Sequence, residues 1–165
     1  ETYHATVLNV IAPHRAGRIV HTLGLADATG YAPVDGRNFE STVAGRDGLH
    51  VIGDAAKTTL PKAGHVGNQE AKICADAILR AFASAPPYPS PTANSACFSP
   101  VNSTQASWLT AVYQYKQDTT TGAWRYVAMD QVSGALGATE AQTYSTGQFG
   151  KMNTWFKSLM AETFS

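Results

Sequence analysis

The chain has 165 residues, of which 44% are hydrophobic and 15% are charged, a composition that can form a hydrophobic core. Lys and Arg number 12, as do Asp and Glu, so the formal net charge is zero and no nucleic-acid partner is expected. No apolar run approaches the roughly 20 residues of a membrane-spanning helix, so no membrane span is expected.

The first half of the chain predicts short strands. Residues 7–11 are an apolar, β-branched run and predict the end of a strand. Residues 15–25 are weakly helical. Residues 49–56 predict an apolar strand of the kind that is buried on both faces of a parallel sheet, and this strand stops abruptly at Gly53-Asp54.

Residues 68–83 predict the clearest helix, after a loop that contains Pro61 and Gly64. Asn68 is a plausible N-cap, and the acidic Glu70 suits the positive end of a helix. The Pro-rich residues that follow cannot continue the helix and indicate a boundary. The predicted organisation is therefore a first domain over 1–85, a linker over 86–91 and a second domain over 92–165.

The second half predicts a hairpin and a helix. Residues 107–116 and 123–129 are rich in aromatic and β-forming residues, and they flank a good turn at 118–122. Residues 149–163 predict an amphipathic terminal helix. The expected fold class is thus α/β in the first half, followed by a small α+β domain.

The two cysteines differ in setting. Cys74 lies in an Ala- and Ile-rich helical run, where a buried, inert thiol is expected. Cys97 lies in a sequence typical of a loop. Neither the cysteines nor the five histidines have the spacing of a zinc site, so no metal site is predicted.

One group of neighbouring sequence features indicates a ligand site. A buried strand that ends in Gly53-Asp54 is followed by a Gly-punctuated loop, residues 61–67, and then by a helix start. Gly53 lets a ligand approach the backbone, and Asp54 can accept hydrogen bonds from ligand hydroxyls. The helix start favours an electron-rich ligand edge. This is half of a cofactor site, although an ordinary connection with a capping Asp has the same pattern.

Longer runs carry a resemblance to a known family. Residues 42–56 look like the second FAD motif of two-dinucleotide-domain flavoproteins of the glutathione-reductase class. Residues 30–36, 51–56 and 60–72 are similar to the flavoprotein subunit of flavocytochrome c sulfide dehydrogenases. The resemblance also includes residues 10–17, the Cys97 segment and the helix with Trp155, so it covers nearly the whole chain.

The resemblance implies a fold, a reaction and partners. The chain would be the C-terminal fragment of a longer two-dinucleotide-domain flavoprotein, whose amino-terminal part carries most of the FAD contacts. The implied reaction is the oxidation of sulfide by FAD, with electrons passed to a c-type cytochrome subunit in the periplasm. On its own the chain would be an incomplete, inactive fragment.

The resemblance also assigns site residues. Asp54 matches the residue that bonds the ribityl and phosphate region of FAD, and residues 61–68 match the segment beside the isoalloxazine ring. Cys97 matches the C-terminal member of a redox-active cysteine pair whose other member lies upstream. His65-Val66 departs from the small polar residues of the family. The implied cofactor-binding residues are Gly53, Asp54, Lys62, Gly64, Asn68 and Trp155, and the implied catalytic residue is Cys97.

Two alternatives stay open at this point. Related flavoproteins use the same scaffold for sulfide–quinone reduction or NADH oxidation. Alternatively, residues 92–165 form a non-catalytic interface module that docks a cytochrome or another subunit. Aromatic crowding on the predicted hairpin favours an interface of some kind, and the aromatic residues concerned are Trp108, Tyr113, Tyr115, Trp124 and Tyr126.

Overall fold

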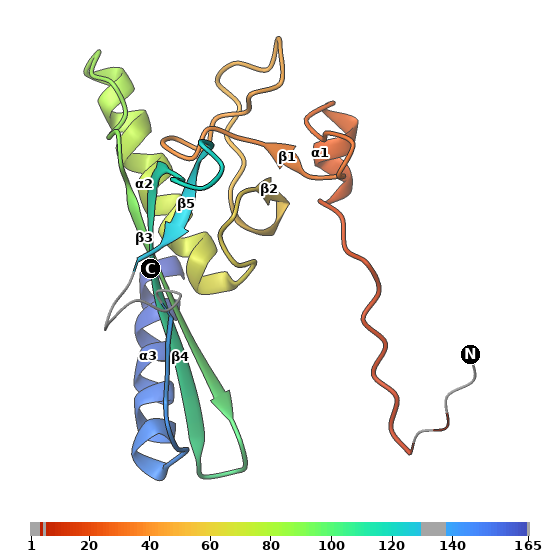
Figure 1. The fold of residues 1–165 in the computed structure, drawn as a ribbon, viewed down its shortest axis with the longest axis vertical. Helices are drawn as coiled ribbons and strands as arrows, with labels where there is room; N and C mark the ends of the chain where they lie inside the picture. Colours follow the sequence, from red (N-terminus) through yellow and green to blue (C-terminus); the bar gives the residue numbers. More distant parts are fainter. Residues whose placement is uncertain (1–3, 5, 130–137, 165) are drawn as a thin grey trace.

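The protein has a mixed α+β fold with two small sheets (Figure 1). The computed structural model describes residue 4, residues 6–129 and residues 138–164. The helices are α1 (Arg18–Thr22), the single-turn 3-10 helix η1 (Gly53–Ala55), α2 (Gly64–Phe82) and α3 (Thr146–Phe164). The strands are β1 (Ala32–Pro33), β2 (Ala56–Lys57), β3 (Thr92–Pro100), β4 (Ala106–Gln117), β5 (Trp124–Ala128) and β6 (Ala138–Glu140).

The first sheet is much smaller than the sequence predicts. It consists of β1 and β2, which run parallel and pair over two residues each. The predicted buried strand over 49–56 is wrong: Leu49 and Ile52 are 39% and 40% exposed, and His50 makes only an isolated bridge to Glu40. No neighbouring strand among the described residues satisfies the backbone of this segment along its length, so the chain takes an irregular path there.

The predicted strand end at residues 7–11 is also wrong. This segment has no regular secondary structure, and Figure 1 shows it running away from the rest of the molecule. Its apolar side chains are largely exposed, with Val7 at 85% and Ile11 at 77%. A β-branched run forms a strand only where another strand accepts its backbone hydrogen bonds, and none of the described residues does so.

Helix α2 begins four residues earlier than predicted. Ala63 is its N-cap and provides no side-chain hydrogen bond, so the assignment of Asn68 as the cap is wrong. The early start follows from packing, because Val66 in the first turn is 1% exposed and lies in the main core. The helix ends as the sequence predicts, with Ser84 in the left-handed region (φ 55°) and the Ala85 N–H bonded to the Arg80 carbonyl.

The second sheet confirms the predicted hairpin and adds two strands. β4 and β5 pair in antiparallel fashion around the predicted turn. In that turn the Thr121 N–H, the Arg125 guanidinium and the Thr120 N–H hold the pKa of Asp118 at about 2. β3, which the sequence does not predict, pairs with the other side of β4 along its whole length, and β6 pairs with β4 beside β5. The predicted terminal helix is present as α3, which lies alongside the long β3–β4 ribbon (Figure 1).

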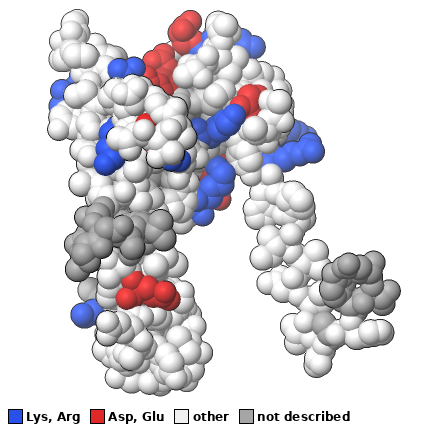
Figure 2. Space-filling model, viewed as in Figure 1, with Lys and Arg blue, Asp and Glu red and all other residues white. Residues whose placement is uncertain are grey.

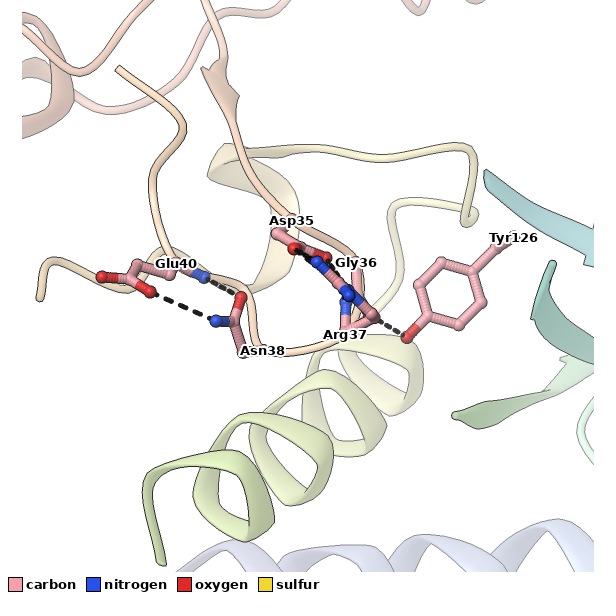
Figure 3. Close-up of polar contacts among 6 residues, drawn as sticks. All are labelled: Asp35, Gly36, Arg37, Asn38, Glu40 and Tyr126. Atoms are coloured by element: carbon pink, nitrogen blue, oxygen red, sulfur yellow. Dashed lines mark hydrogen bonds and ion pairs between the residues drawn. The ribbon is translucent and has the colours of Figure 1, made fainter. Parts of the chain in front are cut away.

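The main core draws residues from both sides of the Pro-rich segment. Tyr126 of β5 is 3% exposed and stacks on Phe39, and its hydroxyl donates a hydrogen bond to the Gly36 carbonyl at 2.7 Å (Figure 3). The Thr59 hydroxyl donates to the Tyr126 carbonyl at 2.6 Å. The members of this core are Phe39, Ala56, Leu60, Val66, Cys74, Ala93 and Tyr126. The two halves that the sequence separates at residues 86–91 therefore contribute to one core. The domain boundary itself stays a prediction.

The helices that the structure describes include none that is long and apolar enough to span a membrane.

A second, smaller core holds α1 and β1 together and is centred on Val20, Leu25 and Ala32. Val51 and Ala55, which lie on either side of Gly53-Asp54, pack against this core.

Candidate functional site

The Gly53–Asp54 turn lies against the start of α2, as the sequence predicts. Gly53 has a φ of 68°, and a Cβ built on Gly67 of α2 comes within 3.4 Å of its Cα. The turn precedes β2, so it lies at the amino end of a parallel strand. The expectation that it lies at the carboxyl edge of a sheet is wrong, because η1 replaces the end of the predicted strand. Asp54 is exposed, and its carboxylate bonds to no residue that the structure describes.

The amino end of α2 is open beside this turn. A Cβ added to Gly64, the first residue of the helix, would meet no atom within 4 Å, and the same is true of Gly53. Because the N-cap side chain provides no hydrogen bond, no side chain in the described part of the chain caps the first backbone N–H groups of the helix. Unpaired N–H groups and the positive end of the helix favour an electron-rich group in this space.

Lys62 holds the backbone of the turn. Its ammonium donates to the Asp54 carbonyl at 2.6 Å and to the Ala56 carbonyl at 2.9 Å. The same ammonium lies 4.3 Å from the centre of the Tyr31 ring, a cation–π contact. Lys62 therefore lies at the predicted site, and in this structure its contacts are with the protein's own backbone and with an aromatic ring.

Trp155 and His65 connect α3 to the start of α2. Their rings meet edge to face at 5.8 Å, and Trp155 also packs on Phe98 of β3 at 5.4 Å. The Nδ1 atom of His65 accepts the Ala96 N–H at 2.9 Å. Burial, followed by the nearby Lys72 ammonium, lowers the pKa of His65, so the ring is neutral at neutral pH and keeps this acceptor. The indole Nε1 of Trp155 is buried and has no partner in the described part of the chain.

A groove of about 480 Å³ runs between the start of α2 and the end of α3. Its volume lies in the range of small-ligand sites. Gly64 and Asn68, two predicted site residues, line it together with Ile52. The Lys72–Glu162 ion pair at 2.6 Å and the hydrogen bond from Asn68 to Thr163 at 3.2 Å close one side. Of the other predicted site residues, Gly53, Asp54 and Lys62 form the turn beside the start of α2, and Trp155 contacts that start through His65.

Cys97 is in the middle of a strand, so the prediction of a loop is wrong. It pairs with Leu109 in the β3–β4 ladder, and its small neighbours allow this extended conformation. Successive side chains of a strand point to opposite faces, so Cys97 lies on the face opposite Phe98 and Trp155. Both thiols are free: Cys74 is buried, as the sequence predicts, and Cys97 is exposed.

The aromatic residues of the hairpin serve the core more than a free surface. Tyr115 packs against both Tyr126 and Trp124, and its ring would be only 2.5 Å from a Cβ on Gly36. Only Trp124 of these rings is largely exposed, at 58%. The aromatic crowding that favours an interface in the sequence is therefore explained mainly by the contact between the two halves of this chain.

Glu70 is a site residue that the sequence pattern assigns to a different role, at the helix start. It lies in the second turn of α2, is 2% exposed, and accepts a hydrogen bond from the Gly53 N–H. A signal is present in the sequence, because Glu70 is the one acidic residue on the buried stripe that also contains Val66, Cys74 and Ala77.

No protein-family model matches the chain. The assignment of the site therefore depends on the geometry around the Gly53–Asp54 turn and on the resemblance of its sequence. Among the residues that the structure describes, no group of three or more His, Cys, Asp and Glu side chains could hold a metal ion.

Proposed function

We propose that this chain is the carboxyl-terminal part of an FAD-dependent oxidoreductase that oxidises sulfide and passes the electrons to a c-type cytochrome in the periplasm. The observation that carries the proposal is the open space at Gly53 and Gly64, where an uncapped helix start faces a glycine turn. This arrangement suits the pyrophosphate, ribityl and ring edges of a flavin dinucleotide, which are rich in oxygen acceptors and hydroxyl donors.

Each predicted cofactor-binding residue has a role in this proposal. The carboxylate of Asp54, which has no partner among the described residues, accepts hydrogen bonds from ribityl hydroxyls, and Gly53 and Gly64 allow the cofactor close to the backbone. Lys62 and Asn68 border the cofactor, and Trp155 fixes the start of α2 through His65. When bound, FAD supplies the two-electron oxidation of sulfide and the one-electron transfer that follows.

The remaining surface supports a larger assembly. Figure 2 shows charged side chains of both signs over the upper part of the molecule, while the lower lobe has red and blue side chains only above an uncharged tip in this view. Leu109 and Val101 of that region are 45% and 52% exposed. We propose that an amino-terminal part of the full-length protein covers the apolar segment 7–11. A second candidate function, docking of a cytochrome by residues 92–165, is favoured by the uncharged end of the ribbon.

The 165-residue chain is expected to bind FAD only weakly. The glycine-rich cradle for the ADP half of the cofactor is absent from this sequence, so most cofactor contacts are lost. Isothermal titration of the chain with FAD measures this affinity. Submicromolar binding would contradict the proposal that the larger share of the site lies upstream.

In the full-length protein, Asp54→Ala is expected to reduce bound FAD at least about tenfold. This variant removes hydrogen bonds between a charged acceptor and the cofactor, each worth about 1.5–3 kcal/mol. Flavin absorbance per protein after gel filtration is the measurement.

Asp47→Ala is the matched control, since Asp47 is an exposed carboxylate in a loop away from α2. It should leave the flavin content unchanged. A full-length protein that purifies without flavin, and that cannot be loaded with FAD, would rule out the proposed function.

A further inference from the structure

Glu70 is a buried carboxyl group on a helix face that is otherwise apolar. It is 2% exposed and lies on the same stripe as Val66, Cys74 and Ala77. A buried carboxyl is costly unless hydrogen bonds replace its hydration, and an apolar residue at this place would fill the core at lower cost.

The contact is with the backbone of the Gly53–Asp54 turn. Glu70 accepts the Gly53 N–H through its side-chain oxygen. Lys62 binds the same turn from the other side, through the carbonyls of Asp54 and Ala56. Glu70 thus holds the N–H at the start of the turn, and Lys62 holds the two carbonyls at its end.

Among the described residues, Glu70 provides the side-chain hydrogen bond to the Gly53 N–H, and Gly53 is the residue of the turn with the most backbone freedom. Gly53 has a positive φ, a Cβ added to it would meet none of the described atoms within 4 Å, and the Asp54 side chain has no partner in the described part of the chain. Without the Glu70 bond, the peptide between Ile52 and Gly53 can rotate, since glycine has wide conformational freedom. Rotation there would change the direction in which the Asp54 carboxylate points.

We propose that Glu70 is the positioning residue of the cofactor turn: its buried carboxyl fixes the Gly53 peptide and thereby aims Asp54 at the ribityl chain of the flavin. The role of Asp54 rests on the proposed function, whereas the hold on Gly53 does not. Glu70 itself touches no cofactor in this proposal, because it lies beneath the turn.

The protonation of Glu70 provides a signature of this role. Burial raises its pKa to about 7, against the opposing effects of the Gly53 N–H and the Lys62 ammonium. The anion is the stronger acceptor, so the bond to Gly53 tightens as the pH rises through 7 and loosens as it falls. The side chains that act on Glu70 are those of Lys62, Asp54, Thr58 and Tyr126. Strand β3, which packs against α2, has no charged residue.

The first test needs no cofactor. The amide proton of Gly53 in the 165-residue chain is followed by NMR from pH 5 to pH 9. We expect its resonance to titrate with a midpoint near 7, and we expect it to exchange slowly with solvent. In Glu70→Gln the titration should disappear while slow exchange persists, because the amide oxygen still accepts. In Glu70→Ala exchange should accelerate at least about tenfold.

Asp76→Asn is the matched control. It makes the same carboxylate-to-amide change on α2, at an exposed position paired only with Arg80 among the described residues. The Gly53 resonance and its titration should be unchanged in this variant. An unaltered Gly53 titration in Glu70→Gln would overturn the proposal, and a loss of titration in Asp76→Asn would assign it to general helix electrostatics and also overturn it.

The second test uses FAD and the full-length protein. Relative to wild type, Glu70→Ala is expected to raise the FAD dissociation constant about tenfold, and Glu70→Gln about threefold, with Asp76→Asn unchanged. If the Gly53 signature is present and the affinities do not change, the aim of Asp54 is not what Glu70 controls, and the proposal fails. If the wild-type protein binds no FAD at all while the Gly53 signature is present, the proposed function fails and the hold of Glu70 on the turn stands.

Discussion

Replacement of Cys97 by Ser in the full-length protein is expected to lower sulfide oxidation by about three orders of magnitude. Removal of a residue that forms the covalent intermediate has effects of this size or larger. Cys97 is exposed in the middle of β3 and has no disulfide partner in this chain, since Cys74 is buried in α2. In the proposed reaction, Cys97 forms a disulfide with an upstream cysteine. Sulfide attacks that disulfide, and one cysteine leaves as a thiolate.

The measurement is the rate of sulfide-dependent cytochrome reduction, together with flavin content. Ser is nearly the same size as Cys, and the exposed strand position tolerates it, so flavin content should not change. Cys74→Ser is the control: it places a hydroxyl in the core and should reduce stability by about 1–3 kcal/mol while turnover per folded protein persists. Normal turnover by the Cys97 variant would show that its assigned role is wrong.

The largest effect on stability is expected from Tyr126→Ala. Tyr126 is 3% exposed, joins the two halves of the core, and bonds to the Gly36 carbonyl. Loss of a large buried aromatic side chain costs about 3–5 kcal/mol, and the unpaired carbonyl adds to this cost. Urea unfolding followed by tryptophan fluorescence measures the free energy of unfolding.

Two further variants separate the contributions at this junction. Tyr126→Phe keeps the packing and removes only the hydroxyl, so it should cost about 1–2 kcal/mol. Trp124→Ala, on the same strand but 58% exposed, should cost less than Tyr126→Ala. Equal losses for Tyr126→Ala and Trp124→Ala would mean that burial at the junction does not determine stability.

The elements that the sequence predicts correctly are those with a local cause. The β4–β5 hairpin follows from β-forming residues around an Asp-to-Gly turn, and α3 follows from a helical period that needs no distant partner. Residues 7–11 and 49–52 have strand-like composition, but a strand also depends on a neighbour, which composition does not reveal. β3 escapes prediction for the opposite reason: its small polar residues suggest a loop, and its pairing with β4 makes it a strand.

The candidate site divides in the same way. Gly53, Asp54 and Gly64 can be found from the sequence, because glycine spacing and a strand-like run point to them directly. The start of α2 at Gly64 depends on the burial of Val66, and the hold of Glu70 on Gly53 depends on two segments 17 residues apart. These contacts arise from tertiary packing, which overrides the capping preference of Asn68.

The hydrogen bond between His65 and Ala96 also protects the protein against aggregation. β3 is an outer strand of its sheet, and an outer strand exposes backbone groups to which another chain can add. The neutral imidazole occupies one of these groups, in the middle of the strand, and Trp155 packs against the same ring. His65, at the start of α2, thus blocks an edge N–H of β3 from pairing with a strand of another copy. Charged side chains often protect an edge strand in this way, and β3 has none.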